Sequence, residues 1–153
     1  VLIELRTVLA VDDKSTFSNC YYIDIDEDSI DGIGRALNNK MNIMKMGGGV
    51  GIDISILRPK DAKVNNSART SSGAVSFMDL FSVSTSSIAQ NSRRGALMLS
   101  IECTHPDIME FIHIKAKDKT KVTSANISIK INTQYIINFC NPYWIKLKKT
   151  KSI

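Results

Sequence analysis

Apolar residues recur along this chain at two different spacings, which predict strands alternating with helices. Residues 20–25 and 50–54 are short runs rich in β-branched and aromatic side chains, typical of strands. Between them, behind an Asp28-Ser29 pair that can cap a helix, apolar residues recur at steps of three and four, as on one face of an amphipathic helix. The residues of this stripe are Ile30, Ile33, Leu37, Met41 and Met44.

The rest of the chain repeats the alternation after a stretch at 57–73 that has no period and is expected to be a loop. Residues 75–89 predict a second helix, and the apolar run at 96–101 is typical of a strand covered on both faces. A third helix is expected to begin at His105-Pro106-Asp107, since proline suits the first turn and aspartate the positive end of the dipole. Residues 124–131 alternate isoleucine with polar residues, as a strand does. The alternation predicts an α/β domain with a largely parallel sheet.

Composition and charge narrow the class of protein. The 153 residues are 43% hydrophobic and 23% charged, which is ordinary for a single soluble domain. The net charge of +5 suits any anionic partner, including nucleotides, and gives no argument for direct binding of nucleic acid. Cys20, Cys103 and Cys140 are too few for a disulfide framework, and no Cys/His pair has zinc spacing, so no metal site is expected. No stretch is long and apolar enough to span a membrane, which makes a reducing cytoplasm the default compartment.

Three local features have both a functional and a structural interpretation. Gly47-Gly48-Gly49-Val50-Gly51, between a predicted helix and a predicted strand, can end the helix or let backbone N–H groups approach a phosphate. The polar segment at 90–95 contains two arginines that can grip phosphate or remain solvated. Cys20, at the head of a strand, is by itself most simply a small buried side chain. Taken one at a time, these features leave the choice open.

Their order along the chain changes this interpretation. Ser18-Asn19-Cys20 is followed by Asp28-Ser29-Ile30-Asp31-Gly32-Ile33, the glycine turn, Leu57-Arg58-Pro59-Lys60, residues 70–78, residues 90–96, His105-Pro106-Asp107 and Asn126-Ile127-Ser128. This series resembles the large, catalytic subunit of the ribonucleotide reductases, from about residue 16 to about residue 131. The resemblance implies the family's ten-stranded α/β barrel, of which residues 1–131 would form the first half, with mostly parallel strands alternating with helices.

The resemblance also implies an activity, the replacement of a nucleotide's ribose 2′-hydroxyl by hydrogen through thiol-dependent radical chemistry. Cys20 matches the first member of the family's redox-active cysteine pair, a role that needs a thiol able to lose a proton and then bond to sulfur. Ser18 and Asn19 are expected to line the substrate site. Gly48 and Gly49 match the turn that contacts the phosphates of a ribonucleoside diphosphate or triphosphate.

A second site is implied for a deoxynucleotide or ATP effector, which in this family binds at the homodimer interface and selects the base to be reduced. The start of the first helix matches one wall of this site, and a helix N-terminus suits phosphate. Residues 60–69 and 90–95 would form two specificity loops. The expected effector-binding residues are Asp28, Ser29, Ile30, Arg58, Gln90 and Arg94.

The chain also departs from the family pattern. Cys140 lacks the Asn-x-Cys-x-Glu surroundings of the radical-forming cysteine, so the chain is expected to be inactive alone and to need the complementary half of the subunit. Residues 132–153 are expected to be a divergent basic tail. No cofactor is expected in this chain, because the family's radical source, adenosylcobalamin or a dimetal small subunit, has no binding region here; a thioredoxin-type reductant would restore the thiols. The alternatives are a catalytically silent nucleotide-binding or interaction module and a truncated remnant.

Overall fold

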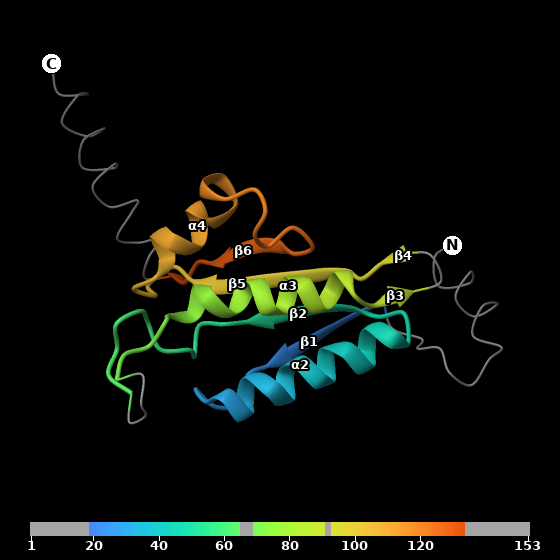
Figure 1. Cartoon of the computed structure of the whole chain (residues 1–153), viewed down its shortest axis with the longest axis horizontal. Coiled ribbons are helices and arrows are strands. Elements are labelled where there is room, and N and C mark those ends of the chain that lie inside the picture. Colours follow the sequence, from blue (N-terminus) through green and yellow to red (C-terminus); the bar gives the residue numbers. More distant parts are fainter. Residues whose placement is uncertain (1–18, 65–68, 91–92, 134–153) are drawn as a thin grey trace, which may run out of the picture.

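The computed structural model describes residues 19–64, 69–90 and 93–133, which form a parallel sheet packed against helices (Figure 1). The sheet has four strands in the order β1-β2-β5-β6, and every neighbouring pair is parallel. These strands are β1 (Cys20–Asp24), β2 (Gly49–Asp53), β5 (Leu97–Glu102) and β6 (Asn126–Lys130). The predicted α/β class with mostly parallel strands is confirmed.

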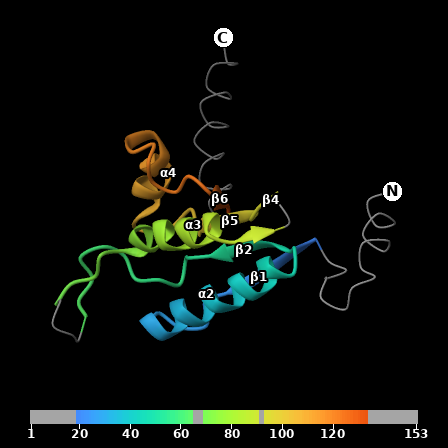
Figure 2. The same ribbon diagram turned by 45° about the vertical axis from the view of Figure 1, so that its right-hand side comes forward.

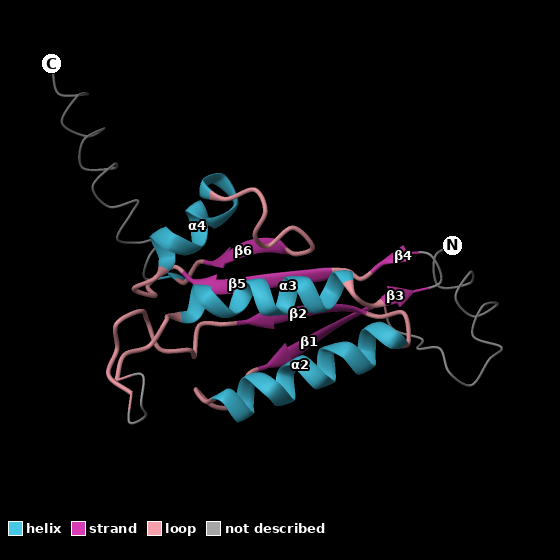
Figure 3. Ribbon diagram, viewed as in Figure 1, coloured by secondary structure: helices cyan, strands magenta, loops and turns pink. Residues whose placement is uncertain are grey.

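A helix lies on each connection between neighbouring strands of the sheet (Figure 3), which is the usual form of the long crossover that parallel pairing requires. The connections contain α2 (Ile30–Lys45), then the 3-10 turn η1 (Ala74–Phe77) with α3 (Met78–Ser86), and finally α4 (Ile108–Lys117). Between α3 and β5, where the sequence predicts a plain polar loop, the chain forms a short antiparallel ribbon. Its strands are β3 (Ala89–Gln90) and β4 (Arg93–Arg94).

Helix α2 begins where the sequence predicts. Ser29 is its N-cap, and the Ser29 hydroxyl accepts the N–H of Gly32 at 2.9 Å. Of the predicted apolar stripe, Ile33 and Met44 are buried in the core. Ile30 is 71% exposed, so the buried stripe begins only at Ile33, one turn into the helix.

One face of the sheet is covered by helices and the other is open. The buried residues of α2, α3 and α4 form a single core with alternate residues of the strands, among them Leu97, Leu99 and Ile101 of β5. Met98, between them, is 48% exposed. The prediction that this strand is covered on both faces is therefore wrong for the described residues, because the helices that they include pack on one side only.

The strand register defines the open face. Side chains of residues paired in a parallel sheet point to the same side, and successive residues alternate. Unlike the isoleucine- and leucine-rich core face, the open face is mostly polar, with two glycines in β2. Its residues are Cys20, Tyr22, Asp24, Gly49, Gly51, Asp53, Met98, Ser100, Glu102, Asn126, Ser128 and Lys130.

A buried lysine joins α2 to α3, and the sequence interpretation missed it. The Lys40 ammonium donates to the carbonyl of Phe81 at 2.7 Å, to Ser84 Oγ at 2.5 Å and to Thr85 Oγ1 at 2.9 Å. Lys40 is 0% exposed, and its burial lowers the pKa of the ammonium to about 8. The three acceptors satisfy all three N–H donors of the ammonium, which is how the core accommodates it.

Candidate functional site

Cys20 begins β1 at the amino end of the open face, and its side chain is exposed. A Cβ atom placed on Gly49 would lie 3.5 Å from Cys20 Sγ and 3.4 Å from Ala96 Cβ. The Gly49 N–H donates to the carbonyl of Asn19 at 2.8 Å, which aligns the starts of β1 and β2. The sulfur and the glycine turn are therefore adjacent, as the sequence predicts. Ser18 lies outside the described residues.

The glycine turn itself is a helix terminus. Gly47 has a φ of 86°, its N–H donates to the Met44 carbonyl at 2.9 Å, and the Gly48 N–H donates to the Ile43 carbonyl at 3.0 Å. These two bonds are those of a Schellman motif, so the helix-ending interpretation is confirmed. Gly48 and Gly49 are both buried. Because the N–H groups of all three glycines already donate within the protein, contact of Gly48 and Gly49 with substrate phosphates stays a prediction.

The β3-β4 ribbon lies at the same end of the sheet as the thiol. Its register pairs Gln90 with Arg93 and Ala89 with Arg94, and residues 91–92 lie outside the described part of the chain. Figures 1 and 2 both show the ribbon beside the end where β1 and β2 begin. The structure thus brings the backbone of the second predicted specificity loop close to the predicted substrate site.

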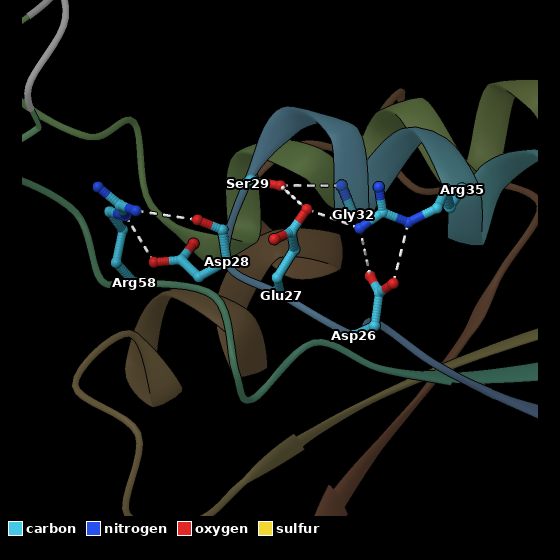
Figure 4. Close-up of polar contacts among 7 residues, drawn as sticks. All are labelled: Asp26, Glu27, Asp28, Ser29, Gly32, Arg35 and Arg58. Carbon is cyan, nitrogen blue, oxygen red and sulfur yellow. Dashed lines mark hydrogen bonds and ion pairs between the residues drawn. The ribbon is translucent and has the colours of Figure 1, made fainter.

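The other predicted residues meet at the opposite, carboxyl end of the sheet (Figure 4). Arg58 Nε lies 2.5 Å from Asp28 Oδ2, and a second guanidinium nitrogen donates to the Asp28 carbonyl at 2.9 Å. Both side chains are about one-third exposed, at 37% for Arg58 and 30% for Asp28. The adjacent Ser29 hydroxyl is occupied by the helix cap and donates to Glu27 Oε1 at 2.8 Å. Asp28 and Arg58, expected in one effector site, are therefore in direct contact.

A second arginine pairs with the neighbouring carboxylates. Arg35 Nε donates to Asp26 Oδ2 at 2.9 Å, and its terminal nitrogen donates to Glu27 Oε1 at 2.6 Å. These hydrogen bonds lower the pKa of Asp26 and of Glu27 and raise the pKa of Arg35. The acidic segment before α2 is consequently neutralised by arginines rather than left as a repulsive cluster.

The predicted site residues thus fall into two groups. Cys20, Gly49 and the ribbon lie at the amino end of the sheet, and the Asp28–Arg58 pair lies at its carboxyl end. Helix α2 runs from one group to the other, and its 16 residues span roughly 24 Å. The structure does not bring Gln90 and Arg94 to Asp28 and Arg58 within this chain.

An ion pair on the open face was missed by the sequence interpretation. The Lys130 ammonium donates to Asp53 Oδ2, reaching from β6 across β5 to β2, while the Ser55 N–H donates to Asp53 Oδ1 at 3.0 Å. Although desolvation opposes ionisation of Asp53, the bonds from Lys130 and Ser55 lower its pKa overall. Desolvation and a hydrogen bond with Asp24 raise the pKa of the nearby Tyr22. The alternation of polar and apolar residues along β2 was the signal that could have indicated this face.

The described residues contain neither a metal-binding cluster nor a membrane-spanning helix. Within residues 19–64, 69–90 and 93–133, no group of three or more His, Cys, Asp or Glu side chains is arranged to hold a metal ion. Among the helices of that same part, none has the length and apolar character needed to cross a membrane.

Comparison with known proteins identifies the family. The sequence profile described as "Ribonucleotide reductase, barrel domain" matches residues 18–149, which includes residues 132–149 beyond the reach of the motif series. A vitamin B12-dependent ribonucleoside-diphosphate reductase of Thermoplasma acidophilum is 39% identical over 139 residues, 89% of this chain and 18% of that protein. The ribonucleoside-diphosphate reductase subunit alpha of Mycoplasma genitalium is 33% identical over 122 residues, 77% of this chain and 17% of that protein.

A solved structure shares the fold. The class Id ribonucleotide reductase alpha subunit of Actinobacillus ureae superposes with a TM-score of 0.68 over 84% of this chain and 23% of its own, at 22% sequence identity. The chain spans about a fifth of the length of the relatives that it matches. With a family profile over most of its residues, a parallel α/β sheet and Cys20 beside the glycine turn, this chain belongs to the ribonucleotide reductase large-subunit family, of which it carries part of the barrel domain.

Proposed function

We propose that this chain supplies one part of the catalytic surface of a ribonucleotide reductase, with Cys20 as a thiol that reduces the substrate. The observation that carries the proposal is the position of Cys20 Sγ, which is exposed on the open face and adjacent to Gly49. The match of residues 18–149 to the family profile supports the view that the proximity of Cys20 to Gly49 is functional and not accidental.

The chemistry requires more than one thiol. Replacing the 2′-hydroxyl by hydrogen takes two electrons and two protons, which two thiols provide when they become a disulfide and the hydroxyl leaves as water. Cys20 would be one of the two. The second thiol, the radical-forming cysteine and the radical source, adenosylcobalamin or a dimetal small subunit, are assigned to the complementary half of the subunit and its partners. A thioredoxin-type dithiol would restore Cys20, and exposure of the side chain favours this exchange.

The open face offers a place for the nucleotide next to the sulfur. The register puts Tyr22, Gly51 and Met98 in one row across β1, β2 and β5. Tyr22 is 60% exposed, and a Cβ on Gly51 would meet no atom closer than 3.9 Å. Gly51 therefore leaves a gap in this row between the exposed side chains of Tyr22 and Met98. Cys20 lies in the adjacent row, about 7 Å away along the strand. We place the substrate's ribose against Gly51, within reach of the sulfur.

The second site would hold a deoxynucleotide or ATP effector at the start of α2. The N-terminus of α2 and the Arg58 guanidinium both favour an anion, and the contact with Asp28 holds Arg58 at this position. The exposed Ile30 beside them would contact the effector's base or the second subunit of a homodimer. An anion here would compete with Asp28 for Arg58.

Closure of the barrel would come from the complementary half. β1 and β6 are the edges of the described sheet, and the edge of a sheet is where a further strand can be added. The polar open face would then become the interior of the barrel, where Cys20 would meet the second cysteine.

Reconstitution tests the catalytic proposal. Mixing this chain with a complementary half that carries the radical-forming cysteine should restore thiol-dependent conversion of a ribonucleoside diphosphate to its deoxy form. Cys20→Ser should abolish this turnover, whereas Cys103→Ser, at the far end of β5 beyond Glu102, should retain it. Turnover by the Cys20→Ser mixture at the rate of the unaltered one would refute the proposal.

Nucleotide binding without turnover is the second candidate function. The Asp28–Arg58 contact favours it, because this chain forms that contact without the complementary half of the subunit. Calorimetry with a deoxynucleoside triphosphate should then show binding that Arg58→Ala weakens. Arg35→Ala is the matched control, since Arg35 is also paired with carboxylates nearby. Binding by every variant in the absence of any reconstituted turnover would select this second function.

A further inference from the structure

Asp107, the residue before α4, is hydrogen-bonded to both ends of a loop that lies far from it in the sequence. The Asp107 carboxylate accepts the backbone N–H of Lys60, with 3.1 Å to each oxygen, and the N–H of Ala74, also at 3.1 Å. Asp107 is only 8% exposed. Lys60 and Ala74 stand at the two ends of the loop that follows Arg58, so a single carboxylate holds both ends of that loop.

Asp107 binds these loop ends instead of capping the helix that follows it. It occupies the N-cap position of α4, but its side chain makes no capping hydrogen bond. At Gly73 the φ is 90° and a Cβ would lie 2.9 Å from Asp107 Oδ2, so the loop reaches the carboxylate through a position that only glycine tolerates. The sequence places Asp107 at the start of a helix correctly, yet its carboxylate binds the two ends of the loop that follows Arg58.

His105 adds a second anchor on the other side of Arg58. The Asp107 N–H donates to His105 Nδ1 at 3.0 Å, which leaves the proton on Nε2, and Nε2 donates to the Leu57 carbonyl at 2.9 Å. The segment from Leu57 to Lys60 is thus held at both ends by the His105-Pro106-Asp107 turn. Arg58 lies between the two anchors, followed by Pro59, whose ring fixes its own φ.

We infer that Asp107, with His105, is a positioning residue for Arg58 and thereby for the bound effector's phosphates. The inference rests on the effector site proposed above. Fixing the backbone on both sides of Arg58 reduces the conformational entropy that the arginine would lose when it binds an anion. Asp107 itself touches no ligand, because its two oxygens are occupied by the N–H groups of Lys60 and Ala74.

Amide hydrogen exchange tests the anchor itself, without any ligand. In Asp107→Ala the amides of Lys60 and Ala74 should exchange about tenfold faster or more, because each loses its acceptor. Asp79→Ala is the matched control, since Asp79 Oδ1 accepts the backbone N–H of Val122 at 3.2 Å in another loop. In that control the Val122 amide alone should exchange faster. Unchanged exchange at Lys60 and Ala74 in Asp107→Ala would overturn the inference.

Calorimetry with deoxyadenosine triphosphate tests the coupling to Arg58. Asp107→Ala should weaken binding about tenfold, Asp107→Asn should weaken it less because one oxygen remains, and Asp79→Ala should leave it unchanged. In an Arg58→Ala background, Asp107→Ala should cause no further loss, since its effect passes through Arg58. Additive losses in the double variant would show general damage and overturn the positioning role.

The two measurements separate two kinds of failure. If the unaltered chain binds no triphosphate, the proposed effector site fails and the positioning role fails with it, while hydrogen exchange still reports on the anchor. If triphosphate binds and Arg58→Ala weakens it but Asp107→Ala does not, the effector site stands and the positioning role alone is refuted.

Discussion

Lys40 places an ammonium group in the core between two helices, where a charge is tolerated only if its donors are satisfied. Its three acceptors all come from α3, so the side chain acts as a polar bridge from α2. The lowered pKa shows that burial still penalises the charged form. The stability of the contact between α2 and α3 should therefore depend on pH, which it would not do with an apolar side chain at position 40.

The first prediction concerns that dependence. The pKa of Lys40 is about 8 in the folded protein and 10.5 when unperturbed, so the unfolded chain binds more protons between these values. The contribution of Lys40 to the free energy of unfolding should thus rise with pH from about 8 to about 10.5, by about 3 kcal/mol in all. Urea unfolding at several pH values should show that Lys40→Met loses this rise, whereas Lys45→Met, at an exposed position of the same helix, keeps it.

A second prediction at this scale concerns Gly51. The change Gly51→Val should fill the position between Tyr22 and Met98 and block the nucleotide. The fold should tolerate it, because the nearest atoms to a Cβ at Gly51 lie 3.9 Å away, an ordinary contact distance. In the reconstituted subunit, calorimetry should show that binding of a ribonucleoside diphosphate weakens at least about tenfold, a loss of about 1.4 kcal/mol. Effector binding at Arg58 should be unaffected. Full substrate affinity in this variant would show that the ribose does not bind at the row of Tyr22, Gly51 and Met98.

At the scale of elements, α2 shows how local sequence sets both ends of a helix. Ser29 caps the start, and the glycine turn provides a left-handed residue and close packing at the end. A Cβ on Gly48 would lie 2.6 Å from Ile43 Cγ2, so the turn also requires a residue without a side chain at position 48. The helix that separates the two proposed sites is thus fixed in length by its own sequence.

The third prediction uses two glycines of opposite effect in and after this helix. Gly47→Ala should destabilise the protein by about 1–2 kcal/mol, because alanine resists the left-handed conformation that Gly47 adopts. Gly34→Ala should stabilise it by about 0.5–1 kcal/mol, since Gly34 is exposed within α2 and a Cβ there meets nothing within 4 Å. Thermal unfolding of both variants checks the signs. Equal effects would mean that the turn does not depend on the conformation of Gly47.

For the whole molecule, the open face is the feature on which the proposed function depends. Its amino end carries the thiol, its middle the unfilled row at Gly51, and its carboxyl end the Asp53–Lys130 pair. This pair ties the edge strand β6 to β2 across β5. A sheet that is polar on the side away from its helices is suited to the ligand-enclosing barrel interior that we propose.

The fourth prediction tests the tie across the sheet. Lys130→Met should lower the free energy of unfolding at pH 7 by about 1 kcal/mol, a modest figure because the lysine is more than half exposed. Asp53 has a lowered pKa, so its contribution is present above the unfolded value of 3.8 and is lost as the pH falls through the folded pKa below it. Urea unfolding between pH 2 and pH 7, at about unit intervals, should show a smaller acid-side loss in Lys130→Met than in the control Lys119→Met. An identical loss of stability in both variants would show that the Asp53–Lys130 pair does not cause it.

Much of this molecule follows from its sequence. The sequence predicts the four strands of the parallel sheet, the three α-helices, the Ser29 cap and the Gly47 turn, because each depends on spacing and conformational preferences within a few residues. It does not predict the β3-β4 ribbon, which forms where a loop is expected. The parallel α/β class was predicted from the alternation of strand and helix patterns, and the observed sheet confirms it. The family was predicted from the order of short motifs, and the comparison with known proteins confirms it. Lys40 also left a signal, since it stands four residues before Met44 on the buried face of α2, where a lysine is out of place.

Contacts between distant residues were decided only by the tertiary structure. The open face of β5 depends on where the crossover helices pack and not on any local preference. The same holds for Asp107, whose carboxylate binds both ends of a distant loop instead of capping its own helix. Such contacts join residues 30 to 77 positions apart, and their partners are set by the order of strands in the sheet, which no periodicity encodes. They are Asp28–Arg58, Lys40–Phe81, Lys60–Asp107 and Asp53–Lys130.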